Sequence, residues 1–155
     1  DKEAPDVNES RSGDPFDLHR FVDAQDGVYS QALRELRRGR KRTHWMWFIF
    51  PQIQGLGHSA ITRHYAVKSP EEARRYLDHP VLGPRLRECA QALLELQTRS
   101  ASHVFGYPDN LKLRSSMTLF AHVAEGDDTV FHRVLDQYFN GRPDPRTLEI
   151  LRELD

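Results

Sequence analysis

The chain is short of cysteine, of long apolar runs and of net charge, and each shortage excludes a class of protein. Its single cysteine, Cys89, allows neither an internal disulfide nor a site built from several cysteines. The longest wholly apolar run, residues 45–50, is far below the ~20 residues that cross a bilayer, so we expect no membrane span. Because 22 basic residues face 23 acidic ones, we rank nucleic-acid binding below a small-molecule pocket. We expect a soluble protein of the cytoplasm.

Histidine is plentiful, but its spacing does not indicate a metal site. His58 and His64 are six residues apart, which places them on different faces of a helix, and no cysteine or carboxylate cluster accompanies them. The sequence also has no Walker loop, nucleophile elbow or dinucleotide-binding glycine pattern. We expect no metal and no cofactor.

Residues 1–14 differ from the rest in having only two apolar side chains, Ala4 and Val7. Such a segment cannot offset the entropy that it would lose on ordering. We therefore predict a disordered tail over residues 1–14 and one folded domain over residues 15–155, a length that suffices for a single core.

Helix starts and apolar stripes follow one another along this domain. Aspartate-proline pairs at 14–15 and 144–145, and the sequence SPEE at 69–72, are typical of first helical turns. Apolar residues at helical spacing predict helices at about 15–25, 29–36, 70–77, 82–96, 109–124, 128–138 and 145–154, with Asp127 or Asp128 capping the sixth. No convincing period-2 alternation occurs. We predict an all-α, single compact domain of about seven helices packed at steep angles.

Residues 37–59 interrupt this pattern with a basic cluster followed by a large apolar run. Most of that run is expected in the core, as a short helix or an extended segment. His44 and Trp45 lie where the basic and apolar stretches meet. We interpret His44 as a candidate general acid or base and Trp45 as a ring that stacks on a ligand.

Two closely spaced glycines follow the apolar run. Gly55 and Gly57 would offer backbone N–H groups to an anion, and Ser59 would cap a helix through Tyr65 whose N-terminus favours negative charge. The alternative is that the glycines only make a turn.

A second unusual segment, residues 112–118, carries three hydroxyls inside a predicted helix. Lys112, Ser115 and Ser116 stand at i, i+3 and i+4, close enough to contact one ligand. The equal alternative is that small residues let a neighbouring helix approach. Arg85 is either a clamp for phosphate or carboxylate or an ordinary surface arginine.

These segments resemble one bacterial family. The stretch HWMWFIFPQIQGLGHS at 44–59, LGPRL at 82–86 and SSMTLF at 115–120 are similar to the domain-of-unknown-function family numbered eighteen-ten, sometimes labelled calpastatin. The resemblance covers about residues 15–154 and implies an all-helical domain. Its motif includes eleven polar, aromatic or glycine positions: His44, Trp45, Gln52, Gly55, Gly57, Ser59, Arg85, Lys112, Ser115, Ser116 and Thr118.

We therefore expect a pocket for a small anionic, nucleotide-like ligand between residues 44–59 and the helix that carries Ser115 and Ser116. Arg85 and Lys112 would neutralise the charge of the ligand.

In the same pocket Trp45 would stack on the ligand and the turn at 55–59 would donate backbone hydrogen bonds. If the protein is an enzyme, hydrolysis or group transfer with His44 as acid or base is the expected reaction. The alternative is a protein-interaction module without catalysis, which predicts an exposed aromatic patch around Trp45. A third reading is that these residues serve folding alone.

Overall fold

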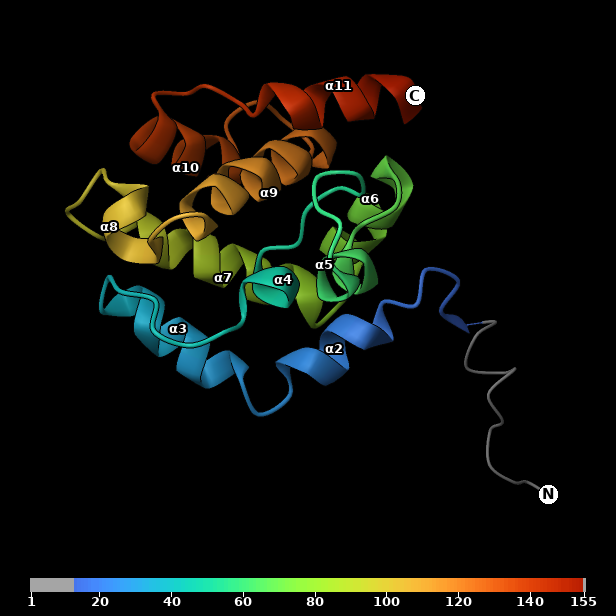
Figure 1. The fold of residues 1–155 in the computed structure, drawn as a ribbon, viewed down its shortest axis with the longest axis horizontal. Coiled ribbons are helices and arrows are strands. Elements are labelled where there is room, and N and C mark those ends of the chain that lie inside the picture. The colour runs from blue at the N-terminus through green and yellow to red at the C-terminus, as the bar shows by residue number, and fades with distance from the viewer. Residues whose placement is uncertain (1–12, 155) are drawn as a thin grey trace.

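The computed structural model describes residues 13–154, and its described part contains ten helices and no strand (Figure 1). The helices are α2 (His19–Gln25), α3 (Tyr29–Arg37), α4 (Met46–Ile49), α5 (Ala60–Tyr65), α6 (Pro70–Asp78), α7 (Leu82–Leu94), α8 (Ala101–Phe105), α9 (Asp109–Val123), α10 (Val130–Phe139) and α11 (Pro145–Leu154). The predicted all-α fold is therefore confirmed. No helix among residues 13–154 is long and apolar enough to cross a membrane.

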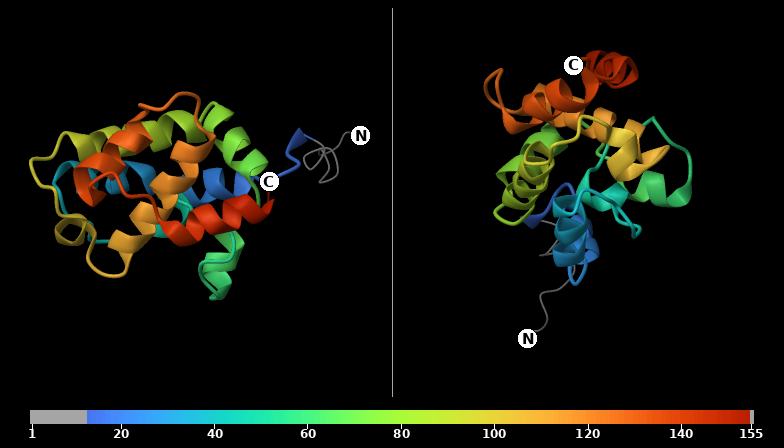
Figure 2. Two further views of the ribbon diagram at one scale, coloured as in Figure 1. Left: turned by 90° about the horizontal axis from the view of Figure 1, so that it is seen from above. Right: turned by 90° about the vertical axis from the view of Figure 1, so that its left-hand side faces the viewer.

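The two longest helices, α7 and α9, form the middle of the molecule. Helix α9 packs against α6, α8, α10 and α11, and α7 packs against α3, α6 and α10. Figure 2 shows α2 and α3 on one side of this pair and α10 and α11 on the other. One buried core runs through these layers, and its largest enclosed side chains include Trp45, Tyr76 and Phe120.

The helix count is ten in the described residues, where about seven were predicted. Helices α4 and α8 have four and five residues, too few to show a clear apolar period. Helix α5 has six residues and begins after Ser59, as its cap predicted, but it was not among the seven helices predicted from apolar spacing. Helix α10 also begins later than predicted, because Thr129 and not Asp127 or Asp128 caps it: the Thr129 side chain accepts the N–H of His132.

At the N-terminal end, residues 1–12 of the predicted tail lie outside the described residues. Asp14 itself takes part in the fold, because its carboxylate accepts the backbone N–H groups of Leu18 and His19. The first helix begins at His19 and not at Pro15, so the helix start predicted at the aspartate-proline pair 14–15 is wrong.

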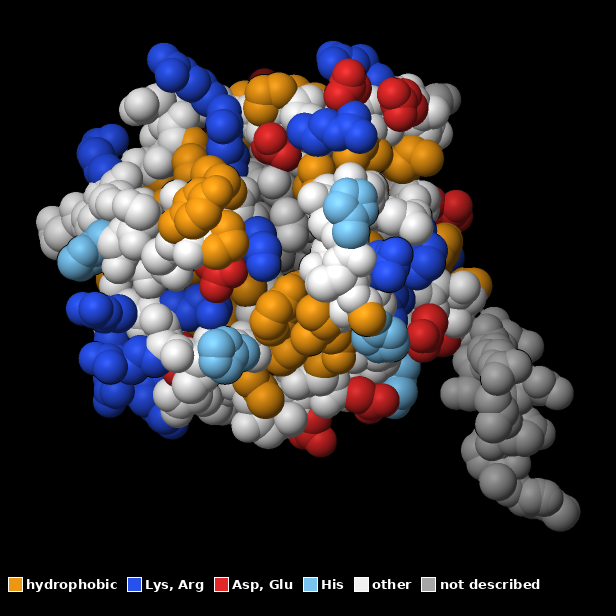
Figure 3. Space-filling view, in the orientation of Figure 1, with side chains coloured by type: hydrophobic (Ala, Val, Ile, Leu, Met, Phe, Trp, Pro, Cys, Tyr) orange, Lys and Arg blue, Asp and Glu red, His pale blue; other side chains and the backbone are white. Residues whose placement is uncertain are grey.

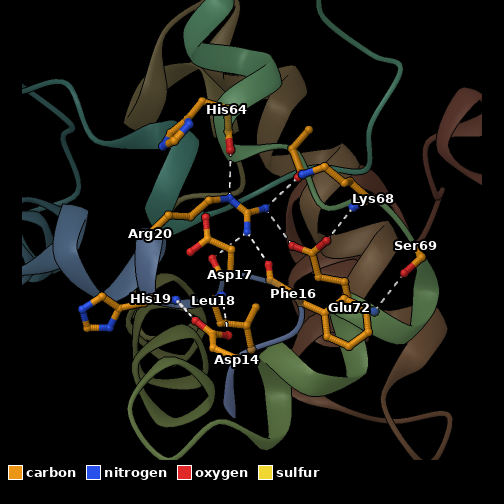
Figure 4. A network of polar contacts seen from close by, with 11 residues as sticks. Asp14, Phe16, Asp17, Leu18, His19, Arg20, His64, Lys68, Ser69 and Glu72 are labelled. Atoms are coloured by element: carbon orange, nitrogen blue, oxygen red, sulfur yellow. Dashed lines mark hydrogen bonds and ion pairs between the residues drawn. The ribbon is translucent and has the colours of Figure 1, made fainter. Parts of the chain in front are cut away.

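A buried arginine joins α2 to the segment before α6 (Figure 4). The Arg20 guanidinium donates to the backbone oxygens of Phe16, Asp17, His64 and Ala66, and it forms an ion pair with Glu72 at 2.7 Å. Every guanidinium nitrogen therefore has a partner, as a buried charge requires. The network fixes the end of α5 and the loop 66–69, which connects α5 to α6.

That loop runs beside the segment 52–54. A parallel bridge joins Ile53 to Val67, with Gln54 N–H donating to Val67 O and Val67 N–H to Gln52 O. This bridge holds residues 52–54, and the candidate site lies between the segment that they begin and α9.

Candidate functional site

A recess of about 270 Å³ lies between the N-terminal half of α9, the segment 52–62 and the start of α11. Figure 3 shows it as a hollow on this face, bordered by basic, acidic and apolar side chains. The residues that line it are Gln52, Leu56, Gly57, Thr62, Pro108, Leu111, Lys112, Ser115, Asp144 and Arg146. The structure thus brings four of the predicted residues together in one cavity: Gln52, Gly57, Lys112 and Ser115.

Lys112 supplies positive charge that the protein does not fully compensate. Its Nζ lies 3.6 Å from Asp109 Oδ1, while the other oxygen of Asp109 takes the shorter 2.9 Å contact with Lys41. Two ammonium groups therefore share one carboxylate. The ammonium of Lys112 also lies 5.3 Å from the centre of the Trp47 ring, which orients the side chain at the recess.

The hydroxyls of α9 hold the start of α11. Ser115 Oγ donates to Asp144 Oδ2 at 2.9 Å, and Thr118 Oγ1 accepts the Asp144 N–H at 2.8 Å while donating to Arg114 O. Asp144 Oδ2 also accepts the N–H and hydroxyl of Thr147, which caps α11. Thr118 thus joins α9 to α11 and does not line the recess, so the ligand contact predicted for it is wrong.

Ser116 is fully buried, and its hydroxyl has no hydrogen-bond partner. It lies on the inner face of α9 as its spacing indicated, but it is not among the residues that line the recess. The predicted ligand contact is wrong here as well.

The two glycines are explained by close packing. A side chain at Gly57 would place its Cβ 2.6 Å from Thr62 Cγ2, and one at Gly55, where φ is +106°, would meet Ile150 at 3.3 Å. Gly57 borders the recess, whereas Gly55 lines only a very small space beside Ile53 and Ala66.

Ser59 begins α5 as predicted, since its side chain accepts the N–H of Thr62. The helix has only six residues, and Ser59 is exposed and does not line the recess. The anion contact predicted for this N-terminus therefore lies apart from the recess.

Trp45 does not stack on a ligand. Its side chain has no exposed surface, and its indole N–H donates to Glu35 Oε1 at 2.8 Å. The same carboxylate accepts hydrogen bonds from Gln31 and from the backbones of Arg42 and Thr43. Burial by itself raises the pKa of Glu35, but these hydrogen bonds outweigh it and hold the pKa at about 2.

Burial of Trp45 also removes the aromatic patch that the interaction hypothesis placed around it. Among the described residues, the large apolar side chains that are exposed are Ile61, Tyr107, Leu111 and Leu154. His44, next to Trp45, is exposed but does not line the recess, so its predicted role as acid or base in that pocket is not supported.

Arg85 lies in a different groove, of about 940 Å³, between α6, α7 and the start of α10. Its guanidinium stacks on Tyr29 at 4.8 Å and donates to Gln25 Oε1 at 3.2 Å. The groove contains Asp78 and Glu125 as well, so its charges are mixed. The prediction that Arg85 and Lys112 share one pocket is wrong.

Asp144 and Arg146 also line the recess, which their sequence context did not indicate. The Asp144-Pro145 pair indicated a helix start, which the structure confirms, and nothing local showed that this start would face α9. Arg146 forms an ion pair with Glu149 at 2.6 Å, and both of these side chains remain about half exposed. Among residues 13–154, no group of three or more His, Cys, Asp or Glu side chains is placed to hold a metal ion.

Comparison with known proteins places the chain in a family without assigning an activity. A family model described as "Protein of unknown function (DUF1810)" matches residues 15–151. The crystal structure of the conserved hypothetical protein Rv1873 from Mycobacterium tuberculosis is similar, with 51% identity and a TM-score of 0.87 over 90% of this chain and 99% of that one. No curated protein matches the chain.

Proposed function

The chain belongs to the DUF1810 family, and from the geometry of its recess we propose that it binds a small ligand with one anionic group, such as a phosphate monoester. The observation that carries this proposal is the convergence of Lys112, Arg146 and Gln52, from three distant parts of the chain, on one cavity. Binding sites commonly combine an apolar wall with a few converging polar groups. Leu56, Pro108 and Leu111 supply that wall here.

The charges of the recess favour an anion. Lys112 and Arg146 bring two positive charges against the single carboxylate of Asp144 among the lining residues. Each of these cations has one acidic neighbour outside the lining, Asp109 and Glu149 respectively. Since Asp109 also pairs with Lys41, and the pair of Arg146 with Glu149 is exposed, both cations retain N–H groups for a ligand.

Gln52 adds an uncharged donor and acceptor. It is half-buried at the recess, and its side-chain amide makes no hydrogen bond within the described part of the chain. An amide at the edge of a cavity can exchange its hydrogen bonds with water for hydrogen bonds with a ligand. The volume of about 270 Å³ lies just below the usual range for ligand pockets, so we expect a small molecule.

We propose that the recess binds this ligand, and we assign no reaction to it. No aromatic ring and no histidine lines the recess, so neither base stacking nor catalysis by His44 forms part of it.

Titration calorimetry with propyl phosphate tests the proposal. We expect Lys112→Met to weaken binding about tenfold, because a charge-assisted hydrogen bond is lost. Lys68→Met is the matched control, since Lys68 is exposed and does not line the recess, and it should bind as the wild type does. Equal affinities of wild type and Lys112→Met, or no binding at all, would contradict the proposal.

A further inference from the structure

Asp144 is a carboxylate in a recess whose other charges are positive. It lines the same cavity as Lys112 and Arg146, and a bare anion bound there is repelled by it. The position of this carboxylate therefore limits which anions the recess accepts.

The carboxylate is held firmly, and only one of its oxygens is used. Oδ2 accepts hydrogen bonds from Ser115 Oγ at 2.9 Å, Thr147 Oγ1 at 2.5 Å and Thr147 N–H at 3.3 Å. The backbone N–H of Asp144 is bound to Thr118. Oδ1, by contrast, accepts no hydrogen bond from any residue in the range 13–154. The fold thus presents a preoriented acceptor with free lone pairs.

Building on the proposed function, we infer that Asp144 is a specificity-determining residue and that the ligand is a hydroxylated phosphate ester of the sugar-phosphate class. Its phosphate lies near Lys112 and Arg146, and a hydroxyl on the neighbouring carbons donates to Asp144 Oδ1. Bringing its own donor, such a ligand converts the repulsion by Asp144 into a hydrogen bond, which a bare phosphate cannot do.

A hydroxyl suits Asp144 better than an ammonium group. Three donors already share the negative charge of Oδ2, which weakens the carboxylate as a counter-ion but leaves it an acceptor. Lys112 and Arg146 in the same cavity repel a second cation. The amide of Gln52 can accept or donate a hydrogen bond to a further hydroxyl.

The test compares two ligands of the same length, glycerol 3-phosphate and propyl phosphate, which differ only in two hydroxyls. We expect the wild type to bind glycerol 3-phosphate about tenfold more tightly. In Asp144→Asn the two affinities should move in opposite directions. Glycerol 3-phosphate should bind several-fold more weakly because its acceptor is lost, and propyl phosphate several-fold more tightly because the repulsion is lost.

Asparagine keeps one oxygen for Ser115 and Thr147 and is a good N-cap, so α11 should remain folded, which circular dichroism checks. Glu125→Gln, the same change in the other groove, is the control and should leave both affinities unchanged. Equal binding of the two esters by the wild type, or a parallel change of both in Asp144→Asn, would overturn this inference while leaving anion binding intact. If the wild type binds neither ester, the proposed function fails, and the inference fails with it.

Discussion

Glu35 and Trp45 are ten residues apart in the sequence and meet in the interior, where the indole N–H donates to the carboxylate. The sequence placed Trp45 at the border of a basic and an apolar stretch, and that border suggested exposure. It could not reveal that a carboxylate on α3 would turn inward and take the indole N–H, together with the backbone N–H groups of Arg42 and Thr43. Contacts of this kind depend on the path of the loop after α3, which no local pattern encodes.

The lowered pKa of Glu35 predicts acid sensitivity. Between the ordinary pKa of 4.5 and the folded value of about 2, the unfolded chain binds a proton at this position and the folded chain does not. This carboxylate therefore stabilises the fold above pH 4.5, and its contribution of roughly 3 kcal/mol is lost as the pH falls from 4.5 toward 2.

Urea unfolding at a series of pH values measures this contribution. The free energy of unfolding of Glu35→Gln should be lower than that of the wild type at pH 6. The difference should shrink by roughly 2–3 kcal/mol by pH 2.5, since glutamine does not titrate. A difference that is independent of pH would contradict the assignment.

Among the elements, α6 and α11 begin where their start signals predict, whereas α2 begins four residues after the pair 14–15 and the short helices α4 and α8 gave no clear signal. Ser69 caps α6 and Asp144 caps α11 as their sequences indicate, because these caps depend on neighbouring residues only. Helices α4 and α8 have four and five residues and are held by tertiary packing, which a single stretch of sequence does not show. The same limit applies to the hydroxyls of α9, whose partners come from α11.

Two neighbouring hydroxyls of α9 should respond in opposite ways to removal. Thr118→Val deletes an oxygen that bonds both Arg114 O and the Asp144 N–H, so we expect a loss of about 1–2 kcal/mol. Ser116→Ala deletes a buried hydroxyl without a partner and should be neutral or slightly stabilising. Thermal unfolding of both variants, measured in parallel with the wild type, gives the change in the free energy of unfolding for each. A clear destabilisation by Ser116→Ala would show that this hydroxyl has a partner that the structure does not reveal.

At the scale of the whole molecule, the fold class followed from the sequence but the assembly of the recess followed only in part. The segments 44–59 and 112–118 were expected to converge, and four of their predicted residues do line one cavity: Gln52, Gly57, Lys112 and Ser115. Arg85 was expected beside them, yet it lies in the groove between α6, α7 and α10, because the rotation of α7 about its axis depends on how it packs against its neighbours. Asp144 and Arg146 enter the recess because α11 packs against α9, a contact that the local sequence does not show.

The ion pair of Arg20 and Glu72 connects distant parts of the fold, and a double-mutant cycle should show it. Arg20→Met and Glu72→Gln each leave a buried polar group without its partner, so each should lower the free energy of unfolding by about 3–5 kcal/mol. The double variant should lose clearly less than the sum of the two. Denaturant unfolding supplies the three values. Additive losses would mean that the two side chains do not stabilise each other.

Nuclear magnetic resonance can show whether an anion binds in the recess between α9, the segment 52–62 and the start of α11. During titration of the ¹⁵N-labelled chain with propyl phosphate, we expect shifts of the backbone amide signals at 52–57, 111–115, 144, 146 and 147. These shifts should saturate together, and Lys112→Met should need about tenfold more ligand to reach the same shifts. Shifts confined to the groove that holds Arg85, or spread over the surface without saturation, would contradict binding in the recess.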